Sequence, residues 1–364
     1  MKEERKRILK LVEEGKLSAE EAIMLIEKLE EEYEHTQTKK LHELSVDVLS
    51  QEEQTEDAKK KESKVSTITA KLLDFVDTAV QKVKELDIDF PFGPSVQFSH
   101  IFQLQQVHVE ELFVHIVNGS VNIETWQDQD IRVECDVKAY KTEDMAAARE
   151  FFLQNSQCQI EGNRFVLFVD KKTLKVNTTI YVPDKVYHQL KIKLFNGPIR
   201  GEQLKIENLK AKTANGMISF KHVKGKMAEA ETANGQIKWN AFSYDELELE
   251  TVNGMIDVQG NVQKLDVQSF NGNLLISLTE PECRTLYAKT TTGNIELTIP
   301  EQMTTQGELK SNLGSFSYDE ENITVTDQKN EVLQKEVKFK KAGTSDEKLT
   351  VFAETKTGSV TITS

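Results

Sequence analysis

Glu231 and Glu250 stand at the same place in two successive sequence repeats, and paired carboxyl groups are the usual machinery for hydrolysing a glycosidic bond. That chemistry needs an acid and a base held close together on one surface. The neighbouring repeats carry Lys212 and Gln268 at this place, so the column is mixed rather than acidic. A stacked acidic pair of this kind is ordinary on a solvated sheet, and we therefore predict no catalytic residues.

The other residue types that could bind a metal or a cofactor form no recognisable set. The seven histidines are His35, His42, His100, His108, His115, His188 and His222. None of them forms a His-x-x-x-His or His-Glu-x-x-His motif, and the three cysteines, Cys135, Cys158 and Cys283, include no Cys-x-x-Cys. The sequence also has no Gly-x-Ser-x-Gly elbow, phosphate-binding glycine loop or dinucleotide fingerprint. We predict no metal and no cofactor, and the free thiols indicate a reducing compartment.

The two glutamates belong to a pattern that occurs seven times between Thr213 and the C-terminus. Each copy has two alternating apolar residues, a hydroxyl residue, a glycine and two more alternating apolar residues. The glycines are Gly216, Gly235, Gly254, Gly272, Gly293, Gly314 and Gly358, and the hydroxyl residues are Thr213, Thr232, Thr251, Ser269, Thr290, Ser311 and Thr355. Alternation with a period of two predicts half-buried β-strands, and glycine spacings of 19, 19, 18, 21, 21 and 44 residues predict a repeat array.

In four copies the residue before the glycine is Asn. The pairs are Asn215–Gly216, Asn234–Gly235, Asn253–Gly254 and Asn271–Gly272. Both residue types tolerate a positive φ angle, so each pair favours a tight type I′ turn. We interpret these residues as structural turn residues, and Asn118–Gly119 and Asn196–Gly197 as earlier versions of the same turn.

Two packings fit the repeat. Each Asn–Gly pair could close a β-hairpin, which predicts a stacked meander or sandwich, or it could form one corner of a β-solenoid coil. The nearly constant period favours the solenoid, because stacking on the nearest neighbour selects coils of equal size. In that fold Ile218, Ile237 and Ile256 form one stacked row. The hydroxyl column then packs and forms hydrogen bonds inside the sheet, rather than presenting a polar ladder to a ligand.

The chain divides into four stretches: a helical hairpin at 1–34, an acidic polar linker at 35–63, an amphipathic helix with a Pro/Phe connector at 64–95, and a β-repeat domain at 96–364. Within the last stretch, residues 96–200 are irregular and residues 201–364 hold the regular repeats. A helix is predicted over 142–155, capped by Thr142. Together these stretches predict a mainly β protein, with an elongated β-solenoid-like domain preceded by helices.

The predicted hairpin is too small to support a core of its own, because so short a chain buries little apolar surface. Its apolar stripes include Leu9, Val12, Ile23, Ile26 and Leu29. We predict that these residues mediate self-association or docking onto a partner protein. The amphipathic segment 65–86 mixes lysines with acidic residues on its polar face, which favours packing on the β-domain or self-association over contact with a membrane surface.

Composition and hydropathy limit the classes of partner and the cellular locations that fit this sequence. The net charge of −14 and the pI near 5.2 argue against electrostatic binding to nucleic acid. No apolar signal-peptide region follows the charged first residues, and no stretch approaches the length of about 18 apolar residues that a membrane helix needs. We predict a cytoplasmic protein, with membrane association through 65–86, or exposure at the cell surface by a route without a signal peptide, as alternatives.

Two segments together resemble a known group of bacterial proteins. Residues 8–26, Ile-Leu-Lys-Leu-Val-Glu-Glu-Gly-Lys-Leu-Ser-Ala-Glu-Glu-Ala-Ile-Met-Leu-Ile, resemble the short helical module of Gram-positive envelope-stress proteins. The Asn–Gly repeats, with Thr179-Ile-Tyr-Val-Pro183 and the following Leu190–Gly197, resemble the bacterial putative-adhesin repeat family, a domain of unknown function. The combination resembles YvlB/LiaX-type proteins of Firmicutes over nearly the whole chain apart from the linker.

The resemblance implies a β-helical repeat domain and a role in the response to cell-envelope stress and antimicrobial peptides, through binding and regulation. The family has no agreed catalytic residues, so the resemblance assigns none here. We predict a non-enzymatic scaffold or regulator that docks onto itself or onto an envelope-stress protein through its hairpin. The first alternative is an adhesin-like module that binds glycans or peptides on its β face. The second is a polysaccharide hydrolase built on Glu231 and Glu250.

Overall fold

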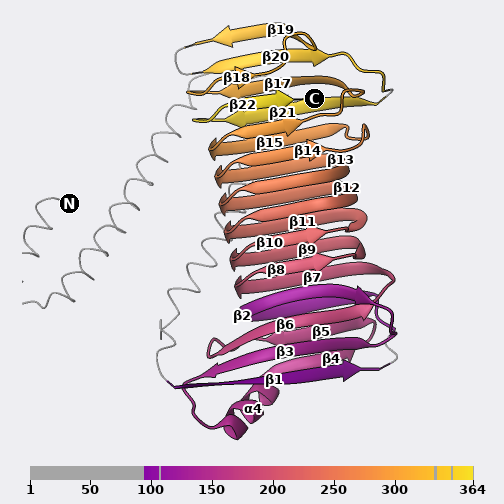
Figure 1. The fold of residues 1–364 in the computed structure, drawn as a ribbon, viewed down its shortest axis with the longest axis vertical. Helices are drawn as coiled ribbons and strands as arrows, with labels where there is room; N and C mark the ends of the chain where they lie inside the picture. The colour runs from indigo at the N-terminus through magenta and orange to yellow at the C-terminus, as the bar shows by residue number, and fades with distance from the viewer. Residues whose placement is uncertain (1–93, 106–107, 332–333, 346, 364) are drawn as a thin grey trace, which may run out of the picture. The chain divides into compact units, whose positions relative to one another are not determined.

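The computed structural model describes residues 94–105, 108–331, 334–345 and 347–363 (Figure 1). The predicted hairpin, the linker and the segment 65–86 lie outside the described residues, so the expectations for them stay predictions. Among the described residues, no helix is both long and apolar enough to span a bilayer.

The described chain is mainly β-structure, as predicted, with one short helix. The N-terminal elements are β1 (Ser95–Leu104), β2 (Glu111–Trp126), β3 (Ile131–Tyr140), α4 (Met145–Gln154), β4 (Ser156–Glu161), β5 (Arg164–Val169) and β6 (Leu174–Pro183). The middle strands are β7 (Val186–Asn196), β8 (Ile199–Glu202), β9 (Lys205–Asn215), β10 (Ile218–Lys221), β11 (Lys224–Asn234), β12 (Ile237–Asn253), β13 (Ile256–Asn271), β14 (Leu274–Leu278), β15 (Thr285–Thr292) and β16 (Ile295–Thr298). The C-terminal strands are β17 (Thr304–Ser311), β18 (Phe316–Ser317), β19 (Ile323–Asn330), β20 (Lys335–Lys341), β21 (Lys348–Thr355) and β22 (Val360–Thr363).

Each regular repeat forms one coil of a β-solenoid, with a strand on each of two facing walls (Figure 1). The long wall contains β7, β9, β11, the later parts of β12 and β13, β15, β21 and β17. The short wall contains β8, β10, the first parts of β12 and β13, β14, β16, β22 and β18. All these pairings are parallel, which a chain of two-residue hairpins cannot produce. The solenoid prediction is therefore confirmed and the hairpin meander is wrong.

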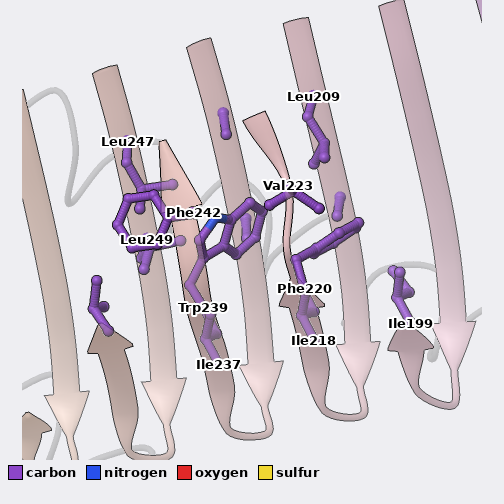
Figure 2. Close-up of a cluster of buried hydrophobic side chains, with 14 of the residues drawn as sticks. Ile199, Leu209, Ile218, Phe220, Val223, Ile237, Trp239, Phe242, Leu247 and Leu249 are labelled. Carbon is purple, nitrogen blue, oxygen red and sulfur yellow. The ribbon is translucent and has the colours of Figure 1, made fainter. Parts of the chain in front are cut away.

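Apolar columns fill the interior between the two walls. Ile218 on β10 pairs with Ile237 on β12, which pairs with Ile256 on β13, so the predicted stacked row is confirmed. Figure 2 shows Ile199, Ile218 and Ile237 of this row, each just beyond its corner. Deeper in the same coils, the rings of Phe220 and Trp239 lie 4.6 Å apart between their centroids, and both are buried. Burial of these columns is the main force that holds neighbouring coils together.

The Asn–Gly corners are not type I′ turns, which corrects the prediction. The non-glycine residues with positive φ among those described are Lys141, Gln203, His222 and Ala241, and none of the corner asparagines is among them. At the corner the parallel ladder continues: the Gly216 amide donates to the Asn234 carbonyl at 2.9 Å. The chain passes from one wall to the other and does not fold back beside itself, so the left-handed geometry of a hairpin is not needed.

Three of these left-handed residues, Gln203, His222 and Ala241, form a column at the opposite corner of successive coils. Gln203 and His222, with φ angles of 56° and 52°, donate through their amides to carbonyls of the next coil. Ala241, with a φ angle of 51°, is one residue in excess where β12 pairs with β13, and the register shifts there between Asn240 and Phe242. The coil that follows lacks this extra residue, which explains why the glycine spacing drops from 19 to 18.

The hydroxyl column faces inward and joins neighbouring coils. Thr213, Thr232 and Thr251 are at most 1% exposed. Their hydroxyl groups donate to the carbonyls of Gly197, Gly216 and Gly235 on the preceding coil, each at 3.1 Å. The interpretation of this column as packed and hydrogen-bonded inside the sheet is therefore confirmed.

We expect Thr251→Val to lower the free energy of unfolding by about 1 kcal/mol, because the substitution keeps the volume but removes the donor to the Gly235 carbonyl. The matched control is Thr361→Val on β22, where the threonine side chain faces outward and is partly exposed. Urea unfolding of the control should stay within about 0.5 kcal/mol of the wild type. An equal loss of unfolding free energy in the two variants would contradict this account of the hydroxyl column.

Both ends of the solenoid depart from chain order. At the N-terminal end β2 lies between the coil of β5 and β6 and the coil of β7 and β8. At the C-terminal end β21 and β22 lie between the coil of β15 and β16 and the coil of β17 and β18. At the N-terminal end, the coil of β5 and β6 therefore lies further out than β2, although β2 comes earlier in the chain. At the C-terminal end, the coil of β17 and β18 lies further out than β21 and β22, although these come later in the chain.

Antiparallel strands close the two ends. Strands β1 and β3 continue from β6, and β4 pairs with β5, while β20 and β19 continue from β17. The helix α4 contacts the N-terminal cap through Phe152, whose ring lies 5.9 Å from that of Phe98. The predicted helix is confirmed, but its N-cap is Asp144 rather than Thr142, because the Asp144 carboxylate accepts from the Ala146 amide at 2.8 Å.

Candidate functional site

Two columns of side chains on the outer surface of the long wall hold the candidate interaction site. The first column stands four residues before each corner glycine and contains, in spatial order, Lys193, Lys212, Glu231, Glu250, Gln268, Lys289, Glu354 and Lys310. The second column stands two residues earlier and contains Lys191, Lys210, Glu229, Glu248, Asp266, Tyr287, Phe352 and Glu308. We call these two columns the outer face. Strand alternation places them outward because the residues between them point into the core.

Charge is segregated along the outer face. Four lysines of β7 and β9 lie next to five carboxyl groups on β11, β12 and β13. Tyr287 and Phe352 follow, with ring planes 4° apart and centroids separated by 5.1 Å, and the Lys310 ammonium lies 5.4 Å from the Phe352 centroid. The aromatic pair was missed at the sequence level, although its members stand at the same position of two repeats.

Ion pairs join the basic and the acidic blocks. The Lys212 ammonium lies 3.0 Å from a Glu229 carboxylate oxygen and also contacts Glu231, while Lys210 contacts Glu229. Burial alone would raise the pKa of Glu229, but hydrogen bonds with Glu231, Lys210 and Lys212 outweigh it and lower this pKa to about 2. Glu229 therefore carries the negative charge that the two lysines neutralise.

The two glutamates singled out in the sequence do stack, since Glu231 pairs with Glu250 across β11 and β12. The expectation that they lie on a solvated surface is wrong for Glu250, which is only 4% exposed. Burial is the largest cause and the hydrogen bond with Glu229 the second largest of a rise in the pKa of Glu231 to about 7. Burial is also the largest cause of a rise in the pKa of Glu250 to about 8, and the negative charges of Glu248, Glu231 and Asp266 add to it. This part of the outer face can therefore hold protons near neutral pH.

The corner asparagines form a continuous ladder along one edge of the solenoid. From Asn196 onward, each side-chain amide donates to the amide oxygen of the asparagine on the preceding coil, at 2.8–3.0 Å. The Asn118 amide donates to the Lys172 carbonyl at 3.0 Å. The members are Asn118, Asn196, Asn215, Asn234, Asn253 and Asn271. Gly216, Gly235, Gly254 and Gly272 follow at the same corners, where each faces the backbone of the neighbouring coil. The geometry thus gives a place in coil stacking to the four predicted Asn–Gly pairs, Asn215–Gly216, Asn234–Gly235, Asn253–Gly254 and Asn271–Gly272.

Histidine and acidic residues form no metal-binding group of three or more within the part of the chain that the structure describes. Two of the histidines each contact a carboxylate. The His115 imidazole lies 3.3 Å from Asp170, and that of His188 lies 2.9 Å from Glu207.

Comparisons with known proteins agree with the fold. The Toastrack DUF4097 family model matches residues 109–363, and a SHOCT-like domain model matches residues 3–34. The "Uncharacterized protein YvlB" of Bacillus subtilis (strain 168) is 52% identical over 360 residues, which cover 99% of this chain and 98% of that protein.

Two solved structures from Parabacteroides distasonis ATCC 8503 are also similar. One is described as a "putative adhesin", with 11% identity, a TM-score of 0.40, and coverage of 75% of this chain and 98% of that chain. The other is described as a "putative lipid binding protein", with 10% identity, a TM-score of 0.37, and coverage of 73% and 97%. The family match spans the solenoid and the sequence identity extends over nearly the full length, so the chain belongs to the Toastrack DUF4097 family.

Proposed function

We propose that the protein is a non-enzymatic scaffold of the bacterial cell-envelope stress response, which acts by binding another protein. The observation that carries the proposal is the outer face, a continuous surface on eight adjacent strands with its basic, acidic and aromatic blocks in a fixed order. Ordered charge of this kind selects a partner with the complementary pattern and fixes its register. The resemblance of the N-terminal segment and the repeats to envelope-stress proteins supports the cellular role.

The same geometry speaks against a hydrolase at Glu231 and Glu250. A glycosidase needs two carboxyl groups that both reach the scissile bond. Here Glu250 is 4% exposed, and Glu231 is held by contacts with Lys212 and Glu229. The polar residues repeated inside the coils are likewise used by the fold, because the inward hydroxyl groups bind glycine carbonyls. The outer face of the long wall is a surface that these contacts inside the coils leave available for binding.

Complementation in a strain that lacks the protein tests the proposal. We expect wild-type protein to restore a normal stress response to a cell-wall antibiotic, and Lys191→Glu/Lys193→Glu to fail although it accumulates and folds. Both lysines are exposed, so the charge reversal changes the outer face without disturbing the core. The matched control is Glu296→Lys, an exposed charge reversal on the short wall, which should restore the response. Full rescue by the lysine variant would refute the role of this face.

Binding to wall material distinguishes the adhesin-like alternative, in which the β face holds glycans or peptides. Purified full-length protein is mixed with insoluble cell-wall polymer and sedimented. The scaffold proposal expects the protein to stay in solution. Sedimentation of the wild type, lost in Lys191→Glu/Lys193→Glu and kept in Glu296→Lys, would replace the scaffold with a glycan-binding module.

The predicted hairpin provides a second, independent test. The substitutions Leu9→Asp and Ile23→Asp place charges in its apolar stripes. We expect them to abolish self-association or partner docking, measured by sedimentation velocity of the full chain with and without the candidate partner, and to leave the unfolding of the solenoid unchanged. If both variants sediment as the wild type does and rescue the stress response, the docking role of the hairpin is wrong.

A further inference from the structure

Five carboxyl groups crowd three adjacent coils of the long wall. They are Glu229 and Glu231 on β11, Glu248 and Glu250 on β12, and Asp266 on β13. Neighbouring strands are about 4.8 Å apart, so carboxylates in paired positions repel strongly when both are ionised. The fold therefore places more acidic groups here than can all carry charge at low cost.

Glu250 lies in the middle of this group. Its partners across the strands are Glu231 and Gln268, and Glu248 precedes it by two positions on its own strand. Lysines lie at both sides of Glu250, but their ion pairs are with other carboxylates: Lys210 and Lys212 pair with Glu229 and Glu231 on β11. On the other side, Lys289 pairs with Glu354 at 3.2 Å. A carboxyl group that is 96% buried among other acids is costly to ionise.

We propose that the acidic group on β11, β12 and β13 is a proton-dependent lock, which tightens the middle coils of the solenoid in mild acid and loosens them as the pH rises. In acid, Glu231 and Glu250 hold protons, and Glu231 donates its proton to the Glu229 carboxylate. In alkali, the two groups ionise beside Glu229, Glu248 and Asp266. The added repulsion then acts across the two strand pairings that β12 makes on the long wall, with β11 and with β13.

The sign of the pH dependence follows from the direction of each shift. The pKa values of Glu231 and Glu250, about 7 and about 8, lie above the ordinary value of 4.5. Folding therefore takes up protons between pH 4.5 and these raised pKa values. Their contribution to stability is complete below pH 4.5 and is lost as the pH rises through 7 and 8. Glu229, with a pKa of about 2, acts in the opposite direction and only below pH 4.5. The acidic group thus stabilises the middle coils in mild acid and destabilises them in mild alkali.

Urea unfolding of the full chain at about pH 5 and about pH 8.5 tests the lock. We expect the wild-type midpoint to fall at the higher pH and the midpoint of Glu250→Gln to fall less, because only the Glu231 contribution remains, so that this variant is the more stable protein in alkali. At about pH 6 its folding should take up about one proton fewer than that of the wild type. Glu296→Gln, an exposed substitution on the short wall, should follow the wild type. Equal pH dependence of the wild type and Glu250→Gln would overturn the proposal.

Hydrogen exchange of the wild type gives a readout that requires no variant. After correction for the intrinsic effect of pH on exchange, protection of the β11, β12 and β13 amides should decrease between the two pH values. Protection of β7 and β9, which carry the lysine block, should change much less. A uniform change along the whole solenoid would show that no local lock exists, and the scaffold proposal would be unaffected by that result.

Discussion

Removal of residues 347–364, which hold β21 and β22, is expected to destabilise the solenoid far more than the loss of an end coil would. These strands form an inner coil: β21 lies between β15 and β17, and β22 lies between β16 and β18. The truncation removes the buried side chains of Leu349, Val351, Ala353, Val360 and Ile362. It also leaves β17 and β18 without their parallel partners and exposes the apolar edge of β15 and β16. At about 1.5–3 kcal/mol for each of the four large side chains, Leu349, Val351, Val360 and Ile362, the loss amounts to at least about 6 kcal/mol, which is comparable to the stability of many domains.

The truncation is tested by limited proteolysis with mass spectrometry and by circular dichroism during urea unfolding. We expect rapid cleavage throughout 304–345 in the truncated protein and a much lower unfolding midpoint, or no cooperative transition. The control is a chain that lacks Ser364 alone, which should match the wild type. If the truncated protein unfolds cooperatively near the wild-type midpoint, with 304–345 still protected, the order of the last coils is wrong.

We expect Gly235→Ala to cost more than about 3 kcal/mol, a loss large enough to prevent folding in many proteins of ordinary stability. A Cβ atom at this corner would lie 2.0 Å from the carbonyl oxygen of Gly216 and 2.5 Å from its carbonyl carbon. Both atoms belong to the backbone of the adjacent coil, so the clash cannot be relieved by turning a side chain. The two coils must separate at the corner, which also stretches the hydrogen bond from Thr232 to the Gly216 carbonyl.

The matched control for this corner is Gly162→Asn, in the turn between β4 and β5. Nothing lies within 4 Å of a Cβ atom there, and the φ angle of +64° is one that Asn adopts readily. Urea unfolding should place the control within about 1 kcal/mol of the wild type. A Gly235→Ala midpoint equal to that of the control would mean that the coils do not pack at the corner as described.

Much of the solenoid could be predicted because each coil is specified by its own sequence. Alternation around Ile218 and Ile237 marks which side chains point inward, and Thr232 and Gly235 recur at fixed distances from them. Equal spacing then places equivalent residues opposite one another, as the pairing of Ile218 with Ile237 confirms. The same reasoning failed at the corners, because an Asn–Gly pair is compatible with both a hairpin and a coil corner and its φ angles depend on where the next strand goes.

The sequence by itself determined the mainly β solenoid, the stacked apolar rows and the inward hydroxyl column, since these follow from local alternation and from a constant period. Only the tertiary structure decided the order of the end coils, because the apolar columns of every coil are alike and any two can stack. It also decided the burial of Glu250 and its raised pKa, which depend on carboxyl groups that β11 and β13 bring beside β12. Charge, unlike periodicity, acts between residues that are distant in the chain and close in space.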